Sequence, residues 1–105
     1  MTATETLLLQ LKLAGLPKPE MEYRFDPKRQ WKFDLCWSDR KVAVEIHGGI
    51  WVQKRHVTGQ GFTTDREKMN EAQLQGWIVL ECTEAQIENG KALHWVERAL
   101  EITRL

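Results

Sequence analysis

The sequence has few cysteines and no long apolar run, and each absence excludes a class of protein. Cys36 and Cys82 stand far apart without a Cys-x-x-Cys spacing, which argues against a disulfide framework or a zinc knuckle. No apolar stretch approaches the roughly 20 residues that a membrane-spanning helix needs, and the leucine-rich start lacks the basic leader of a signal peptide. With 105 residues, enough for one core, we expect a single domain, 1–105, in the cytoplasm.

The charge is balanced over the whole chain but not along it. Fifteen Lys and Arg residues face fifteen Asp and Glu residues, whereas residues 23–56 hold eight basic and four acidic side chains. A basic middle is compatible with a polyanionic partner, and it is equally compatible with a solvated charged surface. Charge alone therefore leaves both interpretations open.

Three helices are predicted, over residues 3–14, 64–75 and roughly 84–104. Thr2 and Glu5 have the spacing of a capping box, and Gly15 and Gly76 follow the first two helices as stop signals. Asn89-Gly90 can divide the last helix into two pieces. Its expected core-facing residues are Ile87, Leu93, Val96 and Leu100, with Trp95 as a further candidate.

Alternating apolar residues predict two strands over 31–37 and 42–47, joined by a turn at Asp39-Arg40. In this register residue i faces residue 79 − i, so that one face is wholly apolar. The expected facing pairs are Trp37 with Val42, Leu35 with Val44, and Phe33 with Ile46.

Two further strands complete the expected sheet. Residues 22–26 alternate in character, and the apolar run from Trp77 to Cys82 is typical of a strand covered on both faces. Between them, residues 50–63 are expected to form a long polar loop, with Thr63 or Thr64 as the cap of the next helix. The order α, β, β, β, α, β, α predicts an α/β fold with a mixed sheet and helices on both faces.

The same hairpin register sets two carboxylates opposite each other. Asp34 and Glu45 would have Cβ atoms about 5 Å apart, and their mutual repulsion needs compensation. A divalent cation such as Mg²⁺ or Mn²⁺ suits hard oxygen ligands. The alternative is that both acids point to solvent or form ion pairs with Lys32 and Lys41.

The joint pattern resembles a known family of nucleases. Its parts are Trp31-Lys32-Phe33-Asp34, Val44-Glu45-Ile46-His47-Gly48-Gly49, the loop around His56, Asp65 with Lys68 and Asn70, and Gly76-Trp77-Ile78-Val79-Leu80. The chain is similar to the PD-(D/E)XK nuclease superfamily, and within it to small phage and prophage endonuclease-like proteins related to very-short-patch-repair-like and Holliday-junction-resolvase-like nucleases. The resemblance implies a restriction-endonuclease-like αβββαβα core.

The resemblance also implies a catalytic set. Asp34 and Glu45 would bind the metal with the backbone carbonyl of Ile46. His47 stands where the family has a lysine, so Lys68, or Lys32 across the strand, would supply the positive charge. Glu5 would add a ligand to the metal cluster, or it is only half of the capping box.

Nucleic-acid contacts are expected from the basic loop. Lys54 and Arg55, with Lys32, would contact the DNA backbone, and His56 would contact or protonate a leaving oxygen unless it is merely solvated. Trp51 would stack on a base or pack in the core. Four other tryptophans are expected to be packing residues: Trp31, Trp37, Trp77 and Trp95. Asp65 and Lys68 either pair with each other or line the site.

The function expected from this set is a metal-dependent endonuclease that hydrolyses DNA. So short a chain has little room for sequence readout, so branched, nicked or mismatched DNA is the expected substrate, with a homodimer where both strands are cut. Two alternatives stay open: a catalytically inactive nucleic-acid-binding module that kept the nuclease fold, and a phage-encoded protein-interaction domain.

Overall fold

A four-stranded mixed sheet organises the molecule. The computed structural model describes residues 1–48 and 59–104. The elements are α1 (Ala3–Leu13), β1 (Glu20–Arg24), β2 (Lys32–Trp37), β3 (Val42–His47), α3 (Gly59–Leu74), β4 (Ile78–Thr83), α4 (Glu84–Glu88) and α5 (Lys91–Ile102). The strands lie in the order β1-β2-β3-β4; the first three are antiparallel, and β4 is parallel to β3 because α3 lies between them in the chain. The predicted α/β class with a mixed sheet is confirmed.

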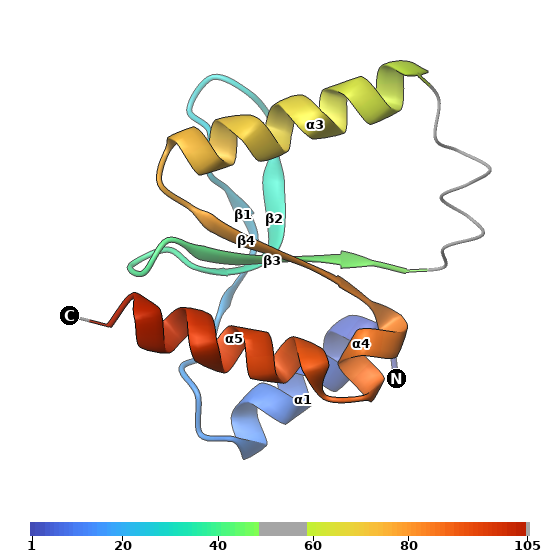
Figure 1. The fold of residues 1–105 in the computed structure, drawn as a ribbon, viewed down its shortest axis with the longest axis vertical. Coiled ribbons are helices and arrows are strands. Elements are labelled where there is room, and N and C mark those ends of the chain that lie inside the picture. Colours follow the sequence, from blue (N-terminus) through green and yellow to red (C-terminus); the bar gives the residue numbers. More distant parts are fainter. Residues whose placement is uncertain (49–58, 105) are drawn as a thin grey trace.

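Helices cover both faces of this sheet (Figure 1). Helix α3 lies on one side, and α1, α4 and α5 lie on the other. The larger core, on the side of α1 and α5, includes Leu7, Leu11, Leu35, Val44, Ile87 and Val96. The smaller core, on the side of α3, includes Phe25, Phe33, Cys36, Ala43, Ala72 and Trp77. None of the helices in the described ranges has the length and apolar character to cross a bilayer.

The predicted capping box and glycine stop signals are present at the ends of the helices. Thr2 Oγ1 accepts from the Glu5 amide at 3.1 Å, and the Thr2 amide donates to Glu5 Oε1 at 2.7 Å, which completes the capping box. Gly76 follows α3 with a φ of 91°, and Gly90 divides the last helix with a φ of 87°. Both glycines adopt the left-handed conformation that other residues disfavour. The division at Asn89-Gly90 is therefore confirmed.

Helix α3 begins earlier than the sequence predicts. It starts at Gly59, so the expected loop is wrong over residues 59–63, and the remainder of that loop lies outside the described residues. Neither Thr63 nor Thr64 is a cap; Thr63 Oγ1 donates to the Gly59 carbonyl at 2.7 Å from within the helix. Glycines at positions 59 and 61 disfavour a helix interior, which is why this turn reads as loop.

The hairpin register of β2 and β3 is confirmed, but the turn is longer. Leu35 pairs with Val44 and Trp37 with Val42, as expected. The connection is four residues, 38–41, and Lys41 takes a φ of 53°. Asp39 and Arg40 are the central residues of this connection, with the Lys41 amide donating to the Ser38 carbonyl at 3.3 Å. A four-residue connection does not require the primed turn for which Asp-Arg is poorly suited.

Phe33 does not share a face with Leu35 and Trp37, contrary to the predicted apolar face. Its ring packs in the smaller core, 4.1 Å from the ring of Phe25 and 4.8 Å from that of Trp77 between centroids. The change of face coincides with Glu22 on the neighbouring strand, whose φ of 50° interrupts the extended backbone between the pairs of Leu35 and Phe33. Strict alternation cannot reveal such a kink.

Candidate active site

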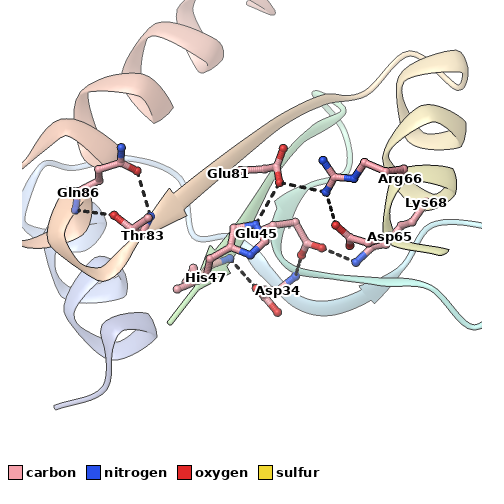
Figure 2. A network of polar contacts seen from close by, with 10 residues as sticks. Asp34, Glu45, His47, Asp65, Arg66, Lys68, Glu81, Thr83 and Gln86 are labelled. Atoms are coloured by element: carbon pink, nitrogen blue, oxygen red, sulfur yellow. Dashed lines mark hydrogen bonds and ion pairs between the residues drawn. The ribbon is translucent and has the colours of Figure 1, made fainter. Parts of the chain in front are cut away.

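The two carboxylates predicted to face each other replace part of the hairpin ladder. The amide of Asp34 donates to Glu45 Oε2 at 3.0 Å, and the amide of Ile46 donates to Asp34 Oδ2 at 2.7 Å. Each side chain thus accepts a hydrogen from the opposite strand, as Figure 2 shows. Because backbone amides hold both groups, their position is fixed by the strands rather than by mobile surface contacts.

Lys68 brings a positive charge to this pair from α3. Its ammonium group forms an ion pair with Glu45 Oε1 and donates to the Lys32 carbonyl at 2.6 Å. Both charged side chains are largely buried, with 14% of the Lys68 side chain and 11% of the Glu45 side chain exposed. Of the two alternatives for Lys68, the structure therefore shows the one in which it lines the site.

The simple ion pairs that would have explained the acids do not form. The ammonium group of Lys41 donates to the Gln75 carbonyl at 2.6 Å, on the other side of the hairpin turn. Lys32 is exposed and contributes its carbonyl to Lys68 rather than its charge to an acid. Asp65 pairs with its neighbour Arg66 instead of Lys68. The carboxylate pair thus keeps one cationic partner among the described residues.

Burial dominates the electrostatics of Glu45. The residue is 8% exposed, and the loss of hydration raises the pKa of its carboxyl group above the ordinary value. The hydrogen bonds from Lys68 and from the Asp34 amide act in the opposite direction, and the nearby charge of Asp34 raises the pKa further. A carboxylate with a raised pKa beside a second acid is typical of a functional site.

His47 meets an acid that the sequence analysis missed. His47 Nε2 lies 3.1 Å from Glu81 Oε1, and Arg66 Nη2 lies 4.0 Å from the same oxygen (Figure 2). Glu81 is the register partner of Glu45 in the parallel β3–β4 pair, so both project from the same face of the sheet. The signal was available: Glu81 is the one acid within the apolar run from Trp77 to Cys82.

The donors around Asp34 and Glu45 suit Mg²⁺ or Mn²⁺. No group of three or more His, Cys, Asp or Glu side chains able to hold a metal occurs within 1–48 and 59–104. Mg²⁺ nevertheless keeps several waters and is commonly bound by one or two carboxylates, so a pair of acids is a sufficient protein contribution. Asp34 Oδ1 accepts no hydrogen bond from a described residue. The residues fit such an ion, with Asp34 and Glu45 as its ligands.

Other predicted site residues lie elsewhere. Glu5 is engaged in its capping box, where the Thr2 amide lowers the pKa of its carboxyl group, and it contacts neither Asp34 nor Glu45. Four expected nucleic-acid contacts lie outside the described residues: Trp51, Lys54, Arg55 and His56. The assignment of four tryptophans to packing is confirmed, since Trp37 and Trp77 are buried and Trp31 and Trp95 pack against the cores.

A hollow of about 390 Å³ lies between Trp31 and the first part of α3, with Lys68 in its wall. Another hollow, of about 530 Å³, lies between α1 and the start of β1, where Leu8, Leu11, Leu16 and Met21 make it mainly apolar. The larger one contains no acid or histidine, so it offers no group for acid–base or metal chemistry. The candidate active site is therefore the carboxylate pair with Lys68, which also lines the smaller hollow.

Comparison with known proteins identifies no relative of the chain. No family model, no curated protein and no solved structure matches it. Any functional assignment therefore rests on the geometry of the cluster and on the motif pattern of the sequence.

Proposed function

We propose that the protein is a metal-dependent endonuclease that hydrolyses DNA phosphodiester bonds. The observation that supports this best is the convergence of Asp34 and Glu45 from facing strands with Lys68 from α3. Two acids that share a site with a lysine provide both a place for a divalent cation and a fixed positive charge for a phosphate. The motif pattern, which resembles the PD-(D/E)XK nucleases, points to the same chemistry.

Lys68 takes the part that the resemblance assigns to a lysine two positions after the glutamate. That position holds His47, whereas the ammonium group of Lys68 reaches Glu45 from the neighbouring helix. The Lys32 carbonyl and the Glu45 carboxylate fix this ammonium group at the edge of the hollow. A phosphate bound there gains a cation that stabilises the charge of the pentacovalent transition state.

His47 serves to orient or deprotonate the attacking water. Its ring contacts Glu81 at 3.1 Å, which restrains the orientation of the imidazole. A metal ion bound by Asp34 and Glu45 would activate the water and stabilise the leaving oxygen. An imidazole can accept or donate a proton, which suits it to this role.

The expected substrate is DNA of unusual structure, in the cytoplasm of a bacterium or a phage-infected cell. The described residues form one small sheet and the helices that cover it, and this leaves little surface for reading a base sequence. A homodimer is expected if both strands are cut. One observation favours a second candidate, an inactive nucleic-acid-binding module: His47 replaces the lysine that the family motif contains.

Cleavage of labelled DNA distinguishes these two functions. Four-way junction, nicked, mismatched and linear duplexes are incubated in Mg²⁺, Mn²⁺ or EDTA with the native protein, Glu45→Gln, and Glu97→Gln. Glu97 is an exposed acid on α5 and provides the matched control. Metal-dependent cleavage that is lost in Glu45→Gln and kept in Glu97→Gln supports the endonuclease. Binding without cleavage in every metal supports the inactive module.

A further inference from the structure

The hollow beside Lys68 has walls that suit a flat aromatic ligand. It is lined by Trp31, Gly61, Thr64, Asp65 and Lys68. Its volume of about 390 Å³ lies within the range of roughly 300–1,000 Å³ usual for small-ligand sites. Lys68 belongs both to this wall and to the ion pair with Glu45, so one side chain links the hollow to the carboxylate pair.

One wall is an aromatic platform with a cation on it. The partly exposed ring of Trp31 is stacked with the ring of Phe25, at 6.3 Å between centroids and an interplanar angle of 19°. The guanidinium group of Arg29 lies 4.6 Å from the centroid of the Trp31 ring. Packing on Phe25 and the smaller core prevents Trp31 from turning away, so the platform exists before any ligand binds.

The opposite wall is the beginning of α3. Gly61 has no side chain to fill the hollow, and next to it Phe62 is 54% exposed, with the Arg66 guanidinium 5.0 Å from its ring centroid. The one acid in the lining, Asp65, is paired with Arg66, so its charge is compensated. Trp31 is thus the aromatic residue of the lining, and Phe62 and Arg66 lie next to the lining residues Gly61 and Asp65.

We propose that this hollow binds one unpaired nucleobase next to the scissile phosphate, so that the substrate is DNA with a single-stranded arm. This inference rests on the proposed nuclease function and narrows its substrate. Bases that are not paired stack on aromatic rings and on guanidinium planes, whatever their sequence. A base inside a duplex is stacked on its neighbours and has to leave the helix before it can enter.

The position of the hollow sets the arrangement of the substrate. A base held between Trp31 and α3 places its own phosphate beside Lys68, the residue that forms the ion pair with Glu45. The guanidinium group of Arg29, over the Trp31 ring and 3.5 Å from Asp26, would contact the next phosphate of the same arm. The duplex then begins on the other side of the carboxylate pair, so the cut falls at the boundary between paired and unpaired DNA.

Binding of a fluorescent base tests this inference without relying on cleavage. A duplex with a single-stranded arm carries 2-aminopurine as its first unpaired base, and a blunt duplex of the same sequence serves as the comparison, both in Ca²⁺. Native protein, Trp31→Leu, Arg29→Gln and the control Trp95→Leu are titrated; Trp95 is a partly buried tryptophan on α5, across the sheet. Thermal unfolding checks that each variant folds.

We expect tight binding of the armed DNA and a change of 2-aminopurine emission on binding. Trp31→Leu should weaken binding of armed DNA by about 5- to 100-fold, which corresponds to the loss of one stacked base, and leave blunt DNA unaffected. Arg29→Gln, which leaves the tryptophan in place, should have a smaller effect in the same direction, and Trp95→Leu none.

Two results would overturn the inference in distinguishable ways. Equal affinity for armed and blunt DNA, unchanged in Trp31→Leu, would exclude the base site and leave the nuclease proposal standing. Absence of binding to either DNA would overturn the base site and the nuclease together.

Discussion

Two acidic residues, Asp26 and Glu45, are buried in the described part of the chain, and they differ in almost every other respect. Asp26 Oδ1 accepts from the amides of Lys28 and Arg29 at 2.8 and 3.2 Å, and the Lys28 hydrogen bond is the main reason that its pKa is lowered. Glu45 accepts one amide and one ammonium hydrogen, yet burial beside Asp34 raises its pKa. Hydrogen bonds outweigh the loss of hydration at Asp26, whereas the loss of hydration outweighs the hydrogen bonds at Glu45.

The contrast separates structure from function. The carboxylate of Asp26 organises the turn before β2, and its charge stabilises the fold. The charge of Glu45 is disfavoured in the folded protein, as is typical of groups at functional sites, and this agrees with the proposed cation site.

The largest expected effect is on catalysis. Glu45→Gln should reduce DNA cleavage by about 100-fold or more, because loss of a group that merely supports a metal ligand already costs about 10–100-fold. Asp26→Asn, at the structural acid, should leave the rate per folded molecule unchanged. Single-turnover cleavage, corrected for the folded fraction, measures both. Equal losses in the two variants would remove the distinction between the acids.

Loss of the Lys68 charge should reduce the cleavage rate nearly as much as loss of the Glu45 charge. Lys68→Met removes the ammonium group that contacts Glu45 and the Lys32 carbonyl, and we expect cleavage to fall by about 10- to 100-fold through loss of transition-state stabilisation. Lys68→Arg keeps the charge and should recover part of the rate. The same single-turnover assay applies. A Lys68→Met protein with the native rate would show that this lysine is only a counter-charge for Glu45.

The free energy of unfolding should respond unequally to loss of the two charges. Asp26→Asn should lower the urea midpoint at neutral pH, because a stabilised carboxylate is lost. In metal-free buffer, Glu45→Gln should lower the midpoint less than Asp26→Asn does, since the charge it removes is disfavoured although Lys68 loses its ion-pair partner. Urea unfolding followed by circular dichroism measures both. A large loss of stability in Glu45→Gln would mean that its ion pair with Lys68 outweighs burial.

The stability contributions of Asp26 and Glu45 should change with pH in opposite directions. The lowered pKa of Asp26 means that its contribution is present above its unfolded-state pKa and is lost as the pH falls through the folded-state value. The raised pKa of Glu45 means that its contribution is present below the unfolded-state pKa and is lost as the pH rises through the folded-state value. Relative to Glu45→Gln, the native protein should therefore lose stability as pH increases from about 4. A difference that is independent of pH would contradict this.

The smallest effect is expected at the thiols. Burial raises the pKa of Cys36 to about 12 and that of Cys82 to about 11, so neither forms a thiolate near neutral pH. A thiol reagent such as Ellman's reagent should modify neither cysteine in the folded protein and both in urea. Rapid modification of the native protein would indicate that the sheet opens locally.

The sequence predicts regular features of this fold well and its irregular ones poorly. Capping residues and the pairing of Leu35 with Val44 follow from local rules, and the meeting of Asp34 with Glu45 follows from that register. Phe33 lies on the opposite face of the sheet from the predicted one, next to the irregular backbone of Glu22 on the neighbouring strand. The alternation of apolar and polar residues does not reveal such an irregularity.

Contacts between distant segments set a similar limit on predicting the site. Lys68 was a candidate from its motif, but its reach to Glu45 depends on where α3 crosses the sheet. Glu81 was missed because its role arises from parallel pairing of β4 with β3, a contact that no spacing along the chain specifies. Trp31 was assigned to packing, which is correct, and its exposed part became informative only beside α3.

The most direct test of the account is the effect of Mn²⁺ on the unfolding of three proteins: native, Glu45→Gln and Asp26→Asn. A metal ion that binds only the folded state, at a concentration 100 times its dissociation constant, adds about 2.7 kcal/mol to the free energy of unfolding. We predict this gain in the native protein and in Asp26→Asn, and its loss in Glu45→Gln. An equal gain in all three proteins, or none in the native one, would contradict the claim that Glu45 is kept buried in order to hold a cation.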